Sequence, residues 1–133
     1  MELTAYVDGA ARGNPGPAGI GIFITDGTGA SLKEIGEPLG RTTNNVAEYS
    51  ALIRALEEAR ALGGASIRIF TDSELMAHQL NGKYKVKAAH LLPLYQRACR
   101  LLALFDQSSV THVRRELNKR ADALSNLGAD QVK

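Results

Sequence analysis

Four acidic residues stand where a carboxylate can do chemistry. Asp8 closes the apolar run LTAYV, Asp72 follows the apolar run SIRIF, and Glu48 and Asp122 lie near the starts of two predicted helices. In a layered α/β sheet, strand ends and helix starts converge on a shared crevice. Carboxylates that meet there repel one another unless a cation holds them, and oxygen ligands suit a hard divalent ion such as Mg²⁺.

Each acid also has a structural explanation. Glu48 follows Asn45 at the spacing of a capping box, and Asp72 stands where a helix cap is common. Asp8 precedes a glycine and suits a turn, and Asp122 near a helix start opposes the helix dipole. The four acids lie in four different elements, and their joint occurrence favours the metal site.

The elements that must position these acids follow from hydropathy and turn signals, and their order is βββαβααβα. The predicted strands cover residues 3–7, 19–25, 30–37, 66–70 and 109–115. The predicted helices run from Asn45 to the Gly63-Gly64 pair, from Ser73 to Gly82, over 89–105, and from an Asn118 cap to Gly128. This order is typical of a mixed sheet with helices packed on it, in the α/β class.

Composition limits the alternatives. A chain of 133 residues suits one domain over residues 1–133, and a net charge of +2 neither indicates nor excludes a nucleic-acid partner. We find no apolar stretch long enough for a membrane helix, no leader pattern, and one cysteine, Cys99, in an apolar helical pattern. We therefore expect a cytoplasmic protein that needs no membrane and acts as a monomer.

Four motifs resemble those of the type I ribonuclease H family (ribonuclease HI), in the family's order and along nearly the whole chain. They are YVDGAARGNPGPAGIG, TTNNVAEYSAL, FTDSELM and NKRADALSN. The resemblance implies a five-stranded mixed sheet with helices on both faces. It also implies a metal-dependent endonuclease that hydrolyses the RNA strand of RNA–DNA hybrids and leaves a 5′-phosphate and a 3′-hydroxyl.

The same resemblance assigns roles to the acids. Asp8, Glu48, Asp72 and Asp122 match the family's metal-site positions, with Asp8 and Asp72 between two Mg²⁺ ions, for which Mn²⁺ can substitute. In such a site one ion activates a water and the other stabilises the departing oxygen.

Substrate contacts are expected on two surfaces. Asn14, Thr43, Asn44 and Asn45 supply neutral donors that suit phosphates and 2′-hydroxyls, or they serve only as caps and turns. The resemblance places Asn14 and Asn45 on the RNA strand and Thr43 on a DNA phosphate. Three alternating lysines, Lys83, Lys85 and Lys87, form either a phosphate track or a plain solvated surface.

Two features depart from better-known bacterial members. The segment NGKYKVKAAHLLPLYQRACR is too compact for their basic protrusion, and the loop before Asn118 is too short for their mobile histidine loop. Arg115 matches an arginine of the compact members and is expected to assist catalysis. His112 falls inside the last predicted strand, where we expect a packed or hydrogen-bonded side chain. The rival interpretation makes His112 the mobile histidine.

Other function classes stay open at this stage. The same fold hosts other metal nucleases, so double-stranded RNA or single ribonucleotides in DNA are alternative substrates. A module that binds nucleic acid without cutting it is a further alternative, although it leaves the four acids unexplained.

Overall fold

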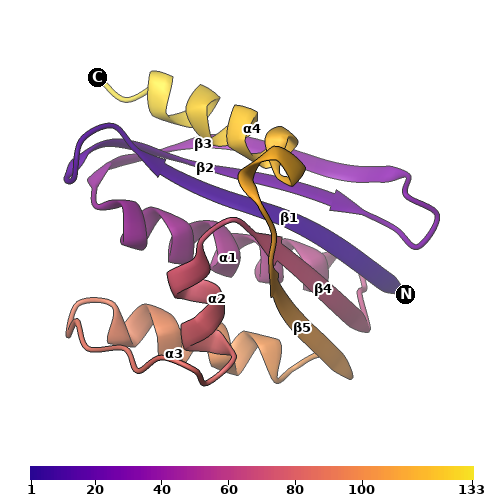
Figure 1. Ribbon diagram of the computed structural model, residues 1–133. Helices are drawn as coiled ribbons and strands as arrows, with labels where there is room; N and C mark the ends of the chain where they lie inside the picture. Colours follow the sequence, from indigo (N-terminus) through magenta and orange to yellow (C-terminus); the bar gives the residue numbers. More distant parts are fainter.

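Five strands form one mixed sheet in the computed structural model, which describes residues 1–133 (Figure 1). The sheet order is β3-β2-β1-β4-β5, with β1, β2 and β3 antiparallel and with β4 and β5 parallel to β1. The strands are β1 (Glu2–Ala11), β2 (Gly16–Thr25), β3 (Ser31–Thr42), β4 (Ser66–Thr71) and β5 (Gln107–His112). The predicted mixed sheet is confirmed.

Helices cover both faces of this sheet, as predicted. Figure 1 shows α4 on one face and α1, α2 and α3 on the other. Helix α4 contacts β1, β2 and β3, whereas α1 contacts β1 and β2 and carries α3 on its outer side. The helices are α1 (Asn44–Ala61), α2 (Glu74–Leu80), α3 (Leu92–Leu102) and α4 (Lys119–Asp130), and a 3-10 turn, η1 (Arg115–Leu117), precedes α4.

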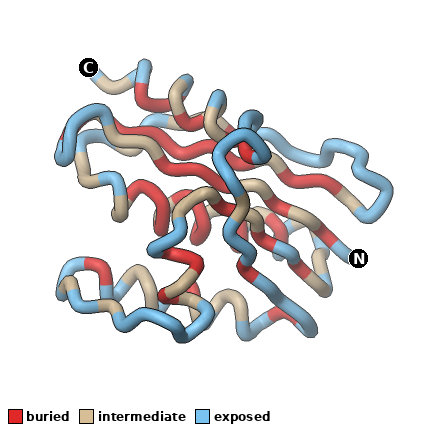
Figure 2. Tube along the Cα trace, viewed as in Figure 1, coloured by how far each residue is buried: buried red, intermediate tan, exposed pale blue.

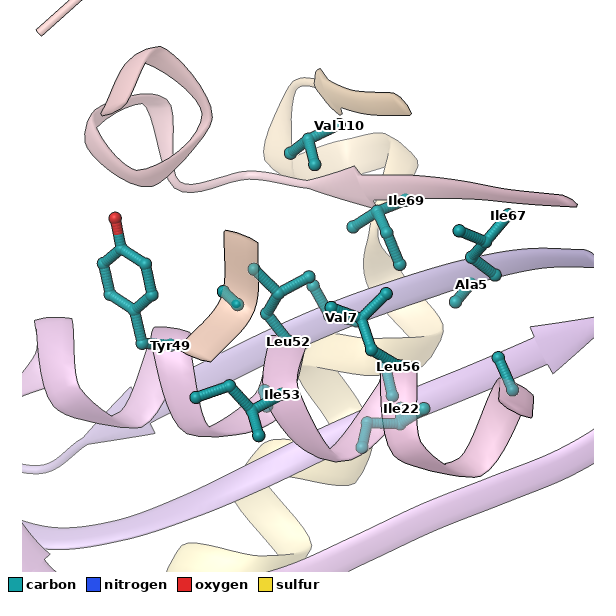
Figure 3. Close-up of a cluster of buried hydrophobic side chains, with 14 of the residues drawn as sticks. Ala5, Val7, Ile22, Tyr49, Leu52, Ile53, Leu56, Ile67, Ile69 and Val110 are labelled. Atoms are coloured by element: carbon teal, nitrogen blue, oxygen red, sulfur yellow. The ribbon is translucent and has the colours of Figure 1, made fainter. Parts of the chain in front are cut away.

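The main hydrophobic core lies between α1 and the sheet. Leu52 and Leu56 of α1 are fully buried and face Val7 of β1 and Ile22 of β2 (Figure 3). Burying a leucine or isoleucine side chain contributes about 2 kcal/mol, so this face alone fixes where α1 lies. The buried residues run along the central strands and the sheet side of α1, while loops and the β5 edge are exposed (Figure 2).

Pairing between strands corrects several predicted boundaries. Strand β1 does not end at Asp8, because its antiparallel pairing with β2 continues to Ala11. Strand β3 extends to Thr42 for the same reason, since it pairs with β2 as far as Gly16. Strand β5 covers 107–112 rather than 109–115, because it pairs residue by residue with the six residues of β4.

Two helices also differ from the prediction. Helix α3 covers 92–102 rather than 89–105, with Pro93 in its first turn as predicted. The chain then turns so that Phe105 is buried ahead of β5. Helix α4 ends at Asp130 rather than at Gly128. Asn118 occupies its N-cap position as predicted, although the Asn118 side chain makes no capping hydrogen bond and donates to the carbonyl oxygen of Val7.

Candidate active site

The parallel pairing of β1 and β4 brings the first two acids to the same level of the sheet. Val7 of β1 pairs with Thr71 of β4. Asp8 directly follows Val7, and Asp72 directly follows Thr71. Strand β4 ends there, because the Thr71 hydroxyl accepts from the backbone N–H of Ser73, whose own hydroxyl caps α2. Asp72 is therefore held on a short turn beside the buried Asp8.

Glu48 reaches this point because a glycine lets α1 approach the strand. A Cβ on Gly9 would lie 2.1 Å from the backbone carbon of Ala47, so only glycine fits. The Gly9 N–H donates to Glu48 Oε1 at 2.6 Å. Glu48 lies beyond the first turn of α1, whose cap is Thr43, so the capping-box explanation of Glu48 is wrong.

Asp122 is placed by the start of α4. The side-chain amide of Asn118 donates to the Val7 carbonyl oxygen at 2.9 Å, which fixes the first turn of α4 next to Asp8. The backbone N–H of Asp122 then donates to the carbonyl oxygen of Asn118. Asp122 Oδ1 lies 3.5 Å from Arg115 Nη2 and 3.5 Å from Asn126 Nδ2.

Three of the four acids form a cluster whose geometry fits a divalent cation. Asp8, Glu48 and Asp72 each offer an oxygen within 4.8 Å of the others. Burial, reinforced by the charge of Asp72, raises the pKa of Asp8 to about 8 although a hydrogen bond from Ser125 opposes the shift. Burial and the charge of Asp8 also raise the pKa of Glu48 well above its ordinary value. The cluster without a cation is electrostatically unfavourable, as expected of a metal site.

The cluster opens into a groove of about 530 Å³, here called the acidic groove. All four acids line it, together with Arg12, Asn44 and Arg115. Arg115 lies on η1, three residues beyond the end of β5, and its side chain is 77% exposed. Its guanidinium can therefore pair with Asp122 and still be free to contact a ligand in the groove.

A second groove, of about 510 Å³, adjoins the first, and Leu75 lines both. We call it the lysine groove, because Lys83, Lys85 and Lys87 all line it, with Asn45 and Tyr84. The three lysines therefore share one surface, as their alternation predicted.

The neutral candidates have structural roles in this region. The Asn14 side-chain oxygen accepts from the backbone N–H of Asn44 at 3.0 Å, and the Thr43 hydroxyl accepts from Val46. Asn44 lines the acidic groove and Asn45 the lysine groove. Of the predicted substrate residues, Asn14 and Thr43 thus shape the site without lining either groove.

His112 lies inside the last strand, but the expected packing of its side chain is wrong. It is the final residue of β5, an edge strand, and it is exposed. It pairs with Thr71 and does not line the acidic groove. Arg115, not His112, therefore faces the acids.

Sequence reasoning missed three polar residues around the acids. Ser125 donates to Asp8 Oδ2 at 2.5 Å, Asn126 donates to the Asp122 carbonyl at 2.9 Å, and Arg12 forms an ion pair with Asp130 and contacts Asn126. Ser125 and Asn126 follow Asp122 by three and four residues. That spacing places them on the same side of a helix, which is the signal that could have found them.

Comparisons with known proteins agree with this fold and cluster. A family model described as "Reverse transcriptase-like" matches residues 6–128. The crystal structure of RNase H1 from Halobacterium salinarum superposes with a TM-score of 0.95 and 45% identity, covering 99% of this chain and 100% of that one. LC11-RNase H1, isolated from compost and solved in complex with an RNA/DNA hybrid, gives 0.91 and 42%, covering 97% of each chain.

Curated relatives are longer than this chain. Ribonuclease HI of Halobacterium salinarum is 48% identical over 131 residues, which is 98% of this chain and 66% of that protein. A bifunctional protein of Mycobacterium tuberculosis is 40% identical over 131 residues, again 98% of this chain but 36% of the relative. The chain thus spans less than two thirds of the length of these relatives.

The fold, with its acidic cluster at the junction of β1 and β4, defines a protein of the ribonuclease H-like class. At this identity and coverage, the chain belongs to the ribonuclease H family. None of its helices combines the length and the apolar character needed to cross a membrane.

Proposed function

We propose that this protein is a metal-dependent endonuclease that hydrolyses the RNA strand of RNA–DNA hybrids. The observation that carries the proposal is the cluster of Asp8, Glu48 and Asp72 at the base of an open groove. A phosphodiester can enter such a groove, whereas a buried structural metal site would be closed. Membership in the ribonuclease H family and the hybrid bound by LC11-RNase H1 support the substrate class.

Asp8, Glu48, Asp72 and Asp122 would hold the metal. When bound, two Mg²⁺ ions, or Mn²⁺ in their place, supply water activation on one side of the phosphodiester and charge stabilisation on the other. All four acids come from one chain and line one groove, and we propose that residues 1–133 act as one domain and as a monomer. Such a substrate is consistent with a role in the cytoplasm.

The chain's own cations bind and orient the nucleic acid in this proposal. Arg115 hydrogen-bonds the phosphate next to the scissile bond, since a guanidinium binds two phosphate oxygens but cannot act as a base near neutral pH. The lysine groove lies beside the acidic groove and carries three ammonium groups, which suits the phosphates of a second strand. Asn44 lines the acidic groove, Asn45 lines the lysine groove, and Asn14 and Thr43 hydrogen-bond to the backbone near them. All four are proposed to contact sugars and phosphates.

Matched RNA–DNA, RNA–RNA and DNA–DNA duplexes, incubated with Mg²⁺, Mn²⁺ or chelator, test this function. We expect metal-dependent cleavage of the hybrid only, with products that carry 5′-phosphates. Asp72→Asn should abolish cleavage and keep the fold, while Asp106→Asn, an exposed acid outside the groove, should cut like wild type. Cleavage in chelator, or full activity of Asp72→Asn, would refute the metal site. Binding without cleavage would favour a non-catalytic module.

A further inference from the structure

The two buried carboxylates of the cluster are each held through one oxygen. Glu48 and Asp8 are both 5% exposed. Glu48 Oε1 accepts from the Gly9 N–H, and Asp8 Oδ2 accepts from the Ser125 hydroxyl. No N–H or hydroxyl group of the protein donates to the second oxygen of either carboxylate, and Asp72 lies within hydrogen-bond reach of Asp8. Each acid is thus fixed on one side and free to bind a cation on the other.

Ser125 is held rigidly by the packing of α4. It is completely buried, and its helix lies directly on the backbone of β2. The approach is so close that a Cβ on Gly21 would be 2.5 Å from the Ser125 nitrogen and 2.0 Å from the carbonyl oxygen of Ala121. The serine lies one helical turn after Asp122. One turn of α4 therefore carries both a groove acid and the hydroxyl that contacts Asp8.

The single hydroxyl proton of Ser125 has two acceptors within reach. Asp8 Oδ2 is at 2.5 Å, and the Asp122 carbonyl oxygen is at 2.8 Å. The Asp122 carbonyl already accepts from Asn126 at 2.9 Å. A hydrogen bond to an ionised carboxylate is also stronger than one to a neutral carbonyl. The Ser125 hydroxyl therefore donates to Asp8, and not to the Asp122 carbonyl, when Asp8 is ionised.

We propose that Ser125 is a positioning residue for the metal site. Its hydroxyl fixes the rotation of the Asp8 carboxylate, so that the remaining oxygen is directed for cation binding with Glu48 and Asp72. This inference rests on the proposed function only in requiring that the cluster binds a divalent cation. Groups that hold metal ligands in place typically contribute a factor of 10 to 100 to metal affinity or activity.

Metal binding without nucleic acid tests the inference. Mn²⁺ is titrated into wild type, Ser125→Ala and Ser50→Ala, with free Mn²⁺ followed by electron paramagnetic resonance and Mg²⁺ added as a competitor. Ser50 is the matched control, because its hydroxyl donates only to the Val46 carbonyl of its own helix and it does not line the groove. We expect the dissociation constant of Ser125→Ala to rise about tenfold or more and that of Ser50→Ala to stay within twofold of wild type.

The outcomes separate positioning from simple stability. A merely structural serine would lower the melting temperature and leave the dissociation constant unchanged, so an unchanged constant for Ser125→Ala overturns the inference whatever its melting temperature. Circular dichroism at the titration temperature verifies that each variant is folded. Absence of Mn²⁺ binding by wild type itself would overturn both this inference and the proposed function.

Discussion

Replacing Asp8 by asparagine should stabilise the protein when no divalent metal is present, and the gain should grow with pH. Asparagine keeps an oxygen that can accept from Ser125 but removes the charge that repels Asp72. The folded protein holds a proton on Asp8 up to about pH 8, whereas the unfolded chain releases it near 3.8. Wild type therefore loses stability as pH rises between these values, and the variant loses less, because only Glu48 of the two buried acids still titrates with a raised pKa.

The size of this effect follows from the pKa difference of Asp8. Between pH 5 and pH 8 the free energy of unfolding of wild type falls by the equivalent of roughly 2.7 pH units, which is about 4 kcal/mol at about 1.4 kcal/mol per unit. A domain of this length changes its melting temperature by about 4 °C per kcal/mol. The gap between Asp8→Asn and wild type should therefore widen by about 15 °C from pH 5 to pH 8.

Thermal melts in chelator at pH 5, 6, 7 and 8 measure this gap by circular dichroism. Asp106→Asn is the matched control and should follow wild type at each pH, because Asp106 is exposed and outside the cluster. Excess Mg²⁺ at pH 8 should raise the melting temperature of wild type much more than that of Asp8→Asn. A gap that does not change with pH would show that burial of the Asp8 charge does not govern stability.

Three further predictions concern turnover, packing and strand choice. Arg115→Ala should lower the turnover number by roughly 10- to 1000-fold, in the range of a lost transition-state charge contact. His112→Ala should keep wild-type activity and stability, because His112 is exposed. If single-turnover assays show that His112→Ala is the slower variant, the assignment is reversed. Gly9→Ala should destabilise the protein by about 3 kcal/mol or more in urea melts, because its Cβ would overlap Ala47, and wild-type stability would contradict the close approach of α1. A hybrid with 2′-deoxy substitutions around the scissile bond should resist cleavage there on sequencing gels, and unchanged cutting would exclude recognition of 2′-hydroxyls.

The sequence predicted most of the elements because their signals are local. Apolar runs bounded by turn signals indicated the strands, the Gly63-Gly64 pair marked a helix end, and Pro93 marked a helix start. The strand boundaries that failed were those that a neighbouring strand determines. The end of β1 at Ala11 depends on β2, and the end of β5 at His112 depends on β4. Pairing partners far along the chain leave no local signal.

The candidate site divides in the same way. The types and positions of the four acids could be read from the sequence. The strand ends and helix starts predicted for them led to the correct expectation that they meet, although β1 continues past Asp8 and Glu48 lies beyond the first turn of α1. Asn118 occupies the N-cap position of α4 as predicted, but its side-chain oxygen accepts no hydrogen bond from the helix, because its amide is oriented to donate to the distant Val7 carbonyl. Whether His112 packs or is exposed also depended on β5 being an edge strand.

The sequence by itself thus determined the chemistry available to this protein, namely which carboxylates and which basic side chains it has and which short elements carry them. The tertiary structure decided the distances, because the acids come from segments that only the sheet brings together. Gly9 and Gly21 let two helices lie directly on strand backbones. This close approach brings the Glu48 carboxylate to the Gly9 N–H and the Ser125 hydroxyl to the Asp8 carboxylate. Asp8 and Ser125 are 117 residues apart in the chain, and helix packing on a twisted sheet, not any local preference, places their oxygens 2.5 Å apart.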